Sequence, residues 1–287
     1  MLRIALPNKG RLSEEALELF ETAGLKADFT SSRALMAKMG PEYQAIFVRA
    51  SDIPEFVADG AADVGVTGHD LVVESARDVT ELFDLGFGRC RLSVAIPESR
   101  GIDSVEDLPS GTRVATSFPG ITTRFFAERG IDIEIAKVSG AAEIAPHLGV
   151  ADVIVDLVST GSTLRVNRLA EIETIVESTA RMVANVDALR DPALRRKIDR
   201  LVTALESVLR ARKKRYLMAN VPREKLDAVR EIVPGMNGPT VVDVMDADEW
   251  VAVHVVVDEN RVFDTISELK DLGAAGILVS RIERLTP

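Results

Sequence analysis

The sequence predicts an α/β protein made of two lobes and a separate unit toward the C-terminus. Short apolar runs alternate with amphipathic segments from residue 2 to about residue 84, and the same alternation starts again near residue 91. From residue 216 onward the segments change to the order βαββαβ. A length of 287 residues agrees with two or three domains.

Residues 2–84 supply the elements expected for the first lobe. An apolar run at 2–6 predicts a strand, and Ser13 is the expected N-cap of a helix that ends near Gly24. The elements that follow are a strand at 45–48, a helix capped by Ser51 and Asp52, and a strand at 64–67.

The second lobe is expected to contain four short strands. They are predicted at 92–97, 113–117, 133–138 and 153–158. Helices are predicted between them, one after Pro119 and one around Glu143. Two lobes of this kind would enclose a cleft, and loops that follow the strands of α/β folds open into such a cleft.

The rest of the chain contains a long helix and the βαββαβ unit. A short apolar segment at 182–186 precedes a helical run from residue 192 to about residue 214. The six elements that follow are predicted at 216–221, 223–233, 240–244, 250–257, 260–272 and 277–282. Their order is that of a ferredoxin-like domain.

The composition disfavours several classes of function. The chain has 35 basic and 45 acidic residues, and its formal net charge of −10 disfavours binding to nucleic acid or to an anionic membrane. His69, His147 and His254 are scattered without metal-ligand spacing. Cys90 is the single cysteine, no apolar stretch approaches about 18 residues, and no signal-peptide core precedes the first strand, so we expect a cytoplasmic protein.

The segment at 151–165, ADVIVDLVSTGSTLR, contains the strongest signal for a ligand site. An apolar strand carries Asp156 and runs into a turn of hydroxyl residues around Gly161. Gly161 permits a backbone that points successive amides inward, and the hydroxyls add donors, so the turn suits a phosphate. Asp156 only accepts hydrogen bonds, which suits sugar hydroxyls beside that phosphate. The Lys of a Walker loop and the glycine pattern of a dinucleotide site are both missing.

This segment resembles the signature of the ATP phosphoribosyltransferase family, in which a Glu and a Gly precede a strand, an Asp and a Ser/Thr-Gly-x-Thr loop. The residues that occupy those places here are Glu143, Gly149, Ile154, Asp156, Leu157, Thr160, Gly161, Thr163 and Leu164. The likeness covers the whole chain, since 1–12, 63–71 and 113–126 resemble further blocks of the family.

The resemblance implies a two-lobed catalytic unit like that of the periplasmic binding proteins, followed by an ACT-like regulatory domain. Residues 1–90 with 183–212 would form the first lobe, 91–182 the second lobe with the loop for phosphoribosyl pyrophosphate (PRPP), and 213–287 the histidine-binding domain. In the implied reaction, N1 of ATP attacks C1 of PRPP and pyrophosphate leaves, with Mg²⁺ bound to the diphosphate. Histidine would inhibit, and a homo-oligomer, a dimer or hexamer, is expected.

The same resemblance distributes roles among the residues. Asp156, with help from Glu143, would hold the ribose hydroxyls and favour positive charge on the ribose. The residues expected around the phosphate of PRPP are Ser159, Thr160, Gly161, Ser162 and Thr163. The candidates for ATP and the diphosphate are Lys9, Arg11, Arg49, Asp70 and Leu71, and those for histidine are Asn220, Thr240 and Gly276. The sequence indicates no direct protein ligand for Mg²⁺.

Two other classes of function compete with this interpretation. A salvage phosphoribosyltransferase would act on a free base, but such enzymes usually place two adjacent acids before the loop, whereas here Leu157 follows Asp156. A two-lobed solute binder fused to a ligand sensor is the other alternative. Binders of that kind are mostly exported, and the absence of a signal peptide disfavours this class without excluding a cytoplasmic sensor.

Overall fold

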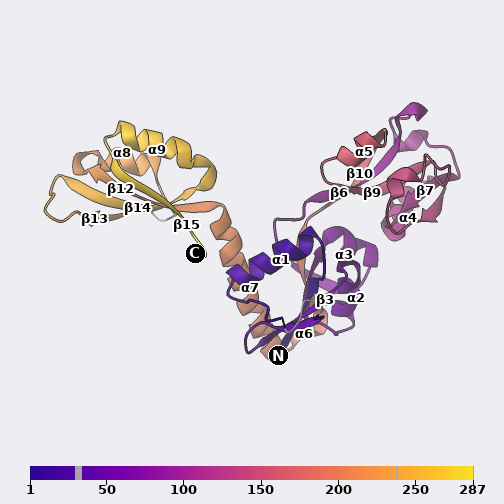
Figure 1. Ribbon diagram of the computed structural model, residues 1–287, viewed down its shortest axis with the longest axis horizontal. Helices are drawn as coiled ribbons and strands as arrows, with labels where there is room; N and C mark the ends of the chain where they lie inside the picture. The colour runs from indigo at the N-terminus through magenta and orange to yellow at the C-terminus, as the bar shows by residue number, and fades with distance from the viewer. Residues whose placement is uncertain (30–33, 237, 287) are drawn as a thin grey trace. The chain divides into compact units, whose positions relative to one another are not determined.

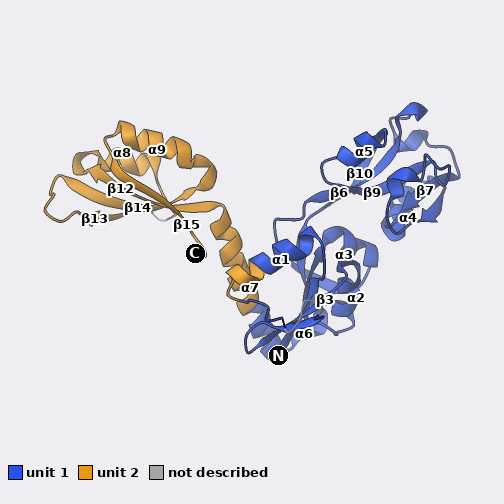
Figure 2. Cartoon of the chain, in the orientation of Figure 1, with its two compact units in different colours: residues 1–18, 25–199 blue, residues 19–24, 200–287 orange. Residues whose placement is uncertain are grey.

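The computed structural model describes residues 1–29, 34–236 and 238–286, and Figure 1 labels many of its helices and strands. The chain divides into two compact units, one of residues 1–18 and 25–199 and the other of residues 19–24 and 200–287 (Figure 2). The first unit contains two sheets and the second contains one.

The first sheet is mixed and has the strand order β2-β3-β1-β4-β11-β5. Its strands are β1 (Leu2–Pro7), β2 (Met36–Lys38), β3 (Tyr43–Val48), β4 (Val64–Gly68), β5 (Val79–Asp84) and β11 (Ala180–Asn185). β1 lies between β3 and β4 and is parallel to both, so the chain returns over helices between these strands. The helices that follow β1, β3 and β4 are α1 (Arg11–Thr22), α2 (Ile53–Ala58) and α3 (His69–Ser75). The two that follow β11 are α6 (Val186–Arg190) and α7 (Pro192–Arg212).

The second sheet has the strand order β10-β6-β9-β7-β8. Its strands are β6 (Cys90–Pro97), β7 (Thr112–Thr116), β8 (Ile133–Lys137), β9 (Val153–Val158) and β10 (Leu169–Ser178). The helices of this lobe are α4 (Pro119–Glu128) and α5 (Ser162–Val166). β9 is a central strand whose residues Val153, Ile154 and Val155 are fully buried, and this burial explains the continuous apolar run in the sequence.

Two crossings of the chain join these sheets. β5 runs into β6 through Leu85–Arg89, and β10 runs into β11 through Thr179. Two backbone hydrogen bonds link the first crossing to Ala180, which follows the second. The Leu85 amide donates to the Ala180 carbonyl over 2.9 Å, and the Ala180 amide donates to the Phe87 carbonyl over 2.9 Å. The two lobes are therefore joined by a pair of hydrogen-bonded connections.

The C-terminal unit has the predicted order βαββαβ. Its elements are β12 (Lys214–Pro222), α8 (Leu226–Ile232), β13 (Thr240–Asp243), β14 (Trp250–Asp258), α9 (Val262–Asp271) and β15 (Ala275–Arg281). The strands pair antiparallel in the order β13-β14-β12-β15, which is the ferredoxin-like arrangement. Alternate residues of β12 and β14 pack against the two helices, with Leu217 and Val253 in the core.

The predicted α/β class, with two lobes and a C-terminal βαββαβ unit, is confirmed, but some local predictions were wrong. Ser13 lies inside α1, which begins at Arg11, and its amide donates to the Gly10 carbonyl over 3.0 Å, so it does not cap the helix. Asp52 is at the N-cap of α2 but makes no capping hydrogen bond. Glu143 lies in a single 3-10 turn, Ala142–Ile144. In the part of the chain that the structure describes, no helix has the length and apolar character needed to cross a membrane.

Candidate functional site

A cavity of about 400 Å³ lies where β9 passes into α5. Its walls come from the 3-10 turn of Glu143, from β9 and from the hydroxyl loop. The lining residues are Ala141, Glu143, Asp156, Leu157, Val158, Ser159, Thr160, Gly161, Ser162, Thr163 and Leu164. The structure thus brings Glu143, Asp156 and every predicted phosphate-loop residue to one cavity.

The loop takes the backbone conformation expected around its glycine. Gly161 has φ of +72°, the left-handed region in which glycine has no steric cost, and it precedes the first residue of α5. The Thr160 and Ser162 hydroxyls lie 3.0 Å apart, and the side chains of Ser159 and Thr163 are exposed as well. The hydroxyl residues and the backbone of this loop therefore line the cavity, and hydroxyl and amide donors of this kind suit an oxyanion.

Asp156 is half-buried in β9, beside this loop. Burial raises the pKa of its carboxyl, the Leu157 amide that donates to Oδ1 over 2.8 Å opposes that change, and the negative charge of Glu143 raises the pKa further. Two carboxylates thus line one polar cavity, and no Lys or Arg occurs among the described residues that line it. A ligand group that carries hydroxyls or positive charge would relieve both.

A second cavity, of about 590 Å³, adjoins the first. Its lining comes from α1, from the start of α3, from both crossings of the chain and from the end of β9. The residues are Arg11, Leu12, Glu15, Gly68, Asp70, Leu71, Gly86, Phe87, Gly88, Arg89, Cys90, Leu157, Ser159 and Ala180. Leu157 and Ser159 line both cavities, so a molecule in one lies beside a molecule in the other.

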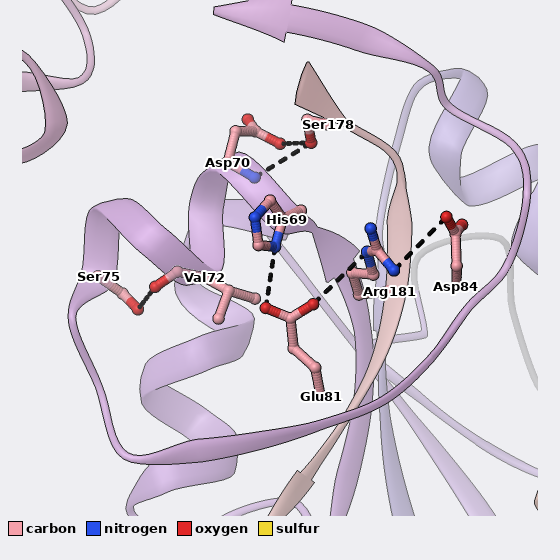
Figure 3. Close-up of polar contacts among 8 residues, drawn as sticks. All are labelled: His69, Asp70, Val72, Ser75, Glu81, Asp84, Ser178 and Arg181. Atoms are coloured by element: carbon pink, nitrogen blue, oxygen red, sulfur yellow. Dashed lines mark hydrogen bonds and ion pairs between the residues drawn. The ribbon is translucent and has the colours of Figure 1, made fainter. Parts of the chain in front are cut away.

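Asp70 is the buried acid of the second cavity, with 4% of its surface exposed. Its amide donates to the Ser178 hydroxyl over 3.1 Å, and that hydroxyl donates to Asp70 Oδ1 over 2.5 Å (Figure 3). Burial raises the pKa of Asp70, and the Ser178 hydrogen bond opposes the change. A Cβ atom at Gly68 would lie 2.2 Å from Asp70 Oδ1, so a glycine there lets the carboxylate keep this position.

His69 points to a different set of partners. Its Nδ1 lies 2.9 Å from Glu81 Oε1, and Arg181 Nε lies 3.5 Å from the other oxygen of Glu81 (Figure 3). Arg181 also reaches Asp84 at 3.5 Å. This network joins α3 to β5 and β11, and His69 is outside the described residues that line the two cavities.

The three predicted phosphate-binding cations are not gathered together. Arg11 lines the second cavity, and its Nε donates to Glu15 Oε1 over 2.8 Å while its side chain remains 84% exposed. Lys9 and Arg49 follow the parallel strands β1 and β3 at the same edge of the first sheet. Among the described residues that line the two cavities, neither of them occurs.

Sequence reasoning missed several residues of the second cavity, among them Leu12, Phe87 and Cys90. The two glycines that flank Phe87, Gly86 and Gly88, could have indicated an irregular connection in the sequence. Both have positive φ in the structure, +75° and +65°. No local signal marks Cys90, whose pKa is raised to about 11 by burial and by the charge of Asp70.

The three predicted histidine-binding residues lie at two separate positions in the C-terminal unit. Asn220 on β12 is close to Gly276 on β15, since a Cβ at Gly276 would lie 3.4 Å from Asn220 Nδ2. Thr240 pairs instead with His254 on β14. It lines a cavity of about 420 Å³ together with His254 and Tyr216, whose hydroxyl is hydrogen-bonded to His254 Nδ1.

Within the described residues, no group of three or more His, Cys, Asp or Glu side chains could hold a metal ion. The pair of carboxylates in the first cavity offers oxygen ligands, which Mg²⁺ prefers. Mg²⁺ is usually held by one or two carboxylates together with the phosphates of a substrate, so this pair fits an ion that arrives with a diphosphate.

Comparisons with known proteins agree on one family. The family model described as ATP phosphoribosyltransferase matches residues 49–207, and the model of the HisG C-terminal domain matches residues 211–284. An ATP phosphoribosyltransferase from Gemmatimonas aurantiaca is 61% identical over the full length of both chains. One from Natronomonas pharaonis is 53% identical, again over the full length of both. A solved chain of the ATP phosphoribosyl transferase (HisG:HisZ) complex from Thermotoga maritima is 30% identical, covers 73% of this chain and 99% of its own, and has a TM-score of 0.66.

Proposed function

The chain belongs to the ATP phosphoribosyltransferase family, whose enzymes carry out the first step of histidine biosynthesis, and we propose that it transfers the 5-phosphoribosyl group of PRPP to N1 of ATP. The observation that carries this proposal is the pair of adjoining cavities. One offers hydroxyls, amides and two carboxylates, and the other offers apolar walls around one buried acid.

The first cavity is proposed to hold the phosphoribosyl half of PRPP. The 5-phosphate lies against the hydroxyls and amides of 159–163, and the ribose hydroxyls donate to Asp156 and Glu143. As the bond from C1 to the diphosphate lengthens, positive charge develops on the ribose. The two carboxylates are already in place to stabilise that charge, so no rearrangement is needed at the moment of reaction.

The second cavity is proposed to hold adenine. Leu12, Leu71 and Phe87 give it apolar walls, and Asp70 can accept a hydrogen bond from the exocyclic amino group. That contact leaves the lone pair of N1 free to attack. Because N1 of neutral adenine carries no proton, the step requires no general base.

The phosphates are proposed to meet the cations at the edge of the first sheet. Arg11 lines the second cavity, and Lys9 and Arg49 follow the neighbouring strands β1 and β3. A Mg²⁺ ion bound to the diphosphate of PRPP would neutralise charge on that leaving group. The carboxylates of Glu143 and Asp156 are the protein oxygens available to that ion in the first cavity.

The C-terminal unit is proposed to be a regulatory domain that binds histidine and lowers activity from a distance. Asn220, Gly276 and Thr240 are the proposed contacts, the first two on the β12–β15 side and the third near His254. We propose three domains. Residues 1–90 with 183–212 form the first catalytic lobe, residues 91–182 form the second, and residues 213–287 form the regulatory domain. We further propose a homo-oligomer, a dimer or hexamer, in the cytoplasm.

The proposal is tested by mixing the protein with Mg²⁺, PRPP and ATP and following pyrophosphate and the mass of the nucleotide product. We expect one pyrophosphate for each phosphoribosyl-ATP formed. Free adenine in place of ATP is the control acceptor. Transfer to adenine in preference to ATP would identify a salvage enzyme, and binding without any turnover would identify a solute binder. Either result contradicts the proposal.

A further inference from the structure

We propose that Ser178 is a positioning residue that holds the Asp70 carboxylate for the nucleotide. The inference rests on the proposed function, because it takes Asp70 as a contact of ATP. Ser178 does not line the second cavity among the residues that the structure describes, so it acts through Asp70 and not by touching the ligand.

Two hydrogen bonds join these residues, and the Ser178 hydroxyl also lowers the pKa of the neighbouring Cys90 thiol. The Ser178 hydroxyl accepts from the Asp70 amide over 3.1 Å and donates its single proton to Asp70 Oδ1 over 2.5 Å. Both residues are buried, with 4% of Asp70 and 2% of Ser178 exposed. The pair is therefore shielded from water, which would otherwise compete for the same bonds.

This bond fixes which oxygen a ligand meets. Oδ1 is engaged by Ser178, and Figure 3 shows the other oxygen of Asp70 turned away from that hydroxyl. In this proposal, Oδ2 is the oxygen that would accept from a donor in the second cavity. Gly68 supports the same orientation, since any side chain there would collide with Oδ1.

The hydrogen bond between Ser178 and Asp70 also joins the two lobes. Ser178 is the last residue of β10 and pairs with Cys90, the first residue of β6. Asp70 is the second residue of α3, on the first sheet's lobe. The bond thus joins the acid of one lobe to the strand end of the other, and the next residue, Thr179, accepts from the His69 amide over 3.0 Å.

The electrostatics point in the same direction. Burial raises the pKa of Asp70, and the Ser178 hydroxyl, together with the Asp70 and Leu71 amides, opposes that change by hydrogen bonding to the carboxylate. The charge of His69 on the same helix also lowers the pKa of Asp70, and the charges of Asp70 and Glu177 act on Cys90 at the start of β6. Arg11, Glu15 and Arg89 are the other charged side chains that line the cavity among the described residues. Removing the hydroxyl removes one of the groups that lower the pKa of Asp70. The pKa should therefore increase, and Asp70 should ionise only at higher pH.

The test compares Ser178→Ala with Ser178→Thr, which keeps a hydroxyl, and with Ser75→Ala. Ser75 is a matched control because it lies on the same helix and its hydroxyl donates to the Val72 carbonyl over 2.8 Å, outside the second cavity (Figure 3). We expect Ser178→Ala to raise the KM for ATP about tenfold or more, because its lost bond involves a charged group. The KM for PRPP should stay within about twofold, since the hydroxyl loop is untouched.

The pH profile provides the readout that a structural role alone would not change. The acid limb of kcat/KM for ATP should move to higher pH in Ser178→Ala and return toward the wild-type position in Ser178→Thr. In an Asp70→Ala background, Ser178→Ala should add no further loss for ATP. PRPP affinity, measured separately, shows that each variant is folded.

Three results would overturn the inference: an unchanged KM for ATP, an equal loss for ATP and PRPP, or a full additional loss in the Asp70→Ala background. These outcomes leave the proposed function standing if the wild type makes phosphoribosyl-ATP. A wild type that neither binds ATP nor forms product would overturn the proposed function and this inference together.

Discussion

Glu143 and Asp156 line one cavity from different elements, and the negative charge of Glu143 adds to burial in raising the pKa of Asp156. The two carboxylates are therefore held near each other at a cost to the ligand-free protein. In the proposed reaction, both carboxylates would stabilise the positive charge that develops on the ribose as the bond at C1 of PRPP breaks.

Asp156→Asn should keep the shape of the cavity and lose much of the turnover. Removing one preorganised electrostatic contact typically raises the barrier by about 2.7 to 4 kcal/mol, so kcat should fall about 10²- to 10³-fold. Steady-state kinetics of the variant measure this. The control is Asp132→Asn, an exposed carboxylate of the same lobe that lies outside both cavities, and it should leave kcat unchanged. A soluble Asp156→Asn enzyme with near-wild-type kcat would remove Asp156 from the mechanism.

Gly161→Val should abolish PRPP binding. Its φ of +72° is costly for a residue with a Cβ, by about 1–2 kcal/mol or more, so the loop would move and its amides would turn away from the phosphate. Gly111→Val is the matched control, because Gly111 has φ of +78° with open space around it and lies far along the chain from the loop. Calorimetric titration with PRPP should separate the two. Equal PRPP affinity in both variants would count against a phosphate loop.

The raised pKa of Asp156 predicts a pH-dependent effect on stability. A carboxyl whose pKa is raised on folding destabilises the folded state as pH increases through that folded-state pKa. Asp156→Asn should therefore unfold at a higher temperature than the wild type at neutral pH without ligand. The difference should shrink as pH falls toward the ordinary Asp value, about 3.9. A difference that stays constant across this range would show that ionisation of Asp156 is not its cause.

Gly276→Leu should remove inhibition by histidine and spare catalysis. Gly276 has φ of +59°, which is unfavourable for a residue with a side chain. A Cβ atom at position 276 would lie 3.4 Å from Asn220 Nδ2, so the rest of a leucine side chain would crowd Asn220. Allosteric couplings of about 1–3 kcal/mol change affinity roughly 5- to 150-fold, so the histidine dose–response curve should move far to the right or flatten. Activity against histidine concentration, with direct histidine binding, is the measurement.

The control for this variant is Gly101→Leu, which has a similar φ of +61° but belongs to the other unit and has open space. Thr240→Val tests whether histidine also uses the cavity near His254. If Gly276→Leu remains fully sensitive, or if histidine competes simply with PRPP in the wild type, the regulatory assignment is wrong.

The sequence was sufficient for features that depend on local pattern. The apolar run of β9 and the hydroxyl loop after it were predicted because burial on both faces and a left-handed glycine leave direct traces in residue type. The role of Ser13 was misassigned because α1 begins two residues earlier, at Arg11, and the Ser13 and Glu14 amides already donate to the Gly10 carbonyl. Local pattern therefore predicts where an element is more reliably than where it begins.

Features that depend on distant pairing could not be predicted. Ser178 contacts Asp70 only because β10 ends beside α3, and the two residues are 108 positions apart. Strands β5 and β10, which complete the sheets on either side of the crossings, were missed as well. β10 has mostly half-buried residues and two register shifts, which obscure the alternation of its side chains.

The most direct test of the account is to identify the bond that the enzyme makes. PRPP labelled with ¹³C at C1 is incubated with Mg²⁺ and ATP labelled with ¹⁵N at N1, and the product is examined by NMR. Transfer to N1 predicts a one-bond coupling between the two labels, with one pyrophosphate released for each coupled product. A ribose carbon attached to another nitrogen, or PRPP hydrolysis without any coupled product, would contradict it.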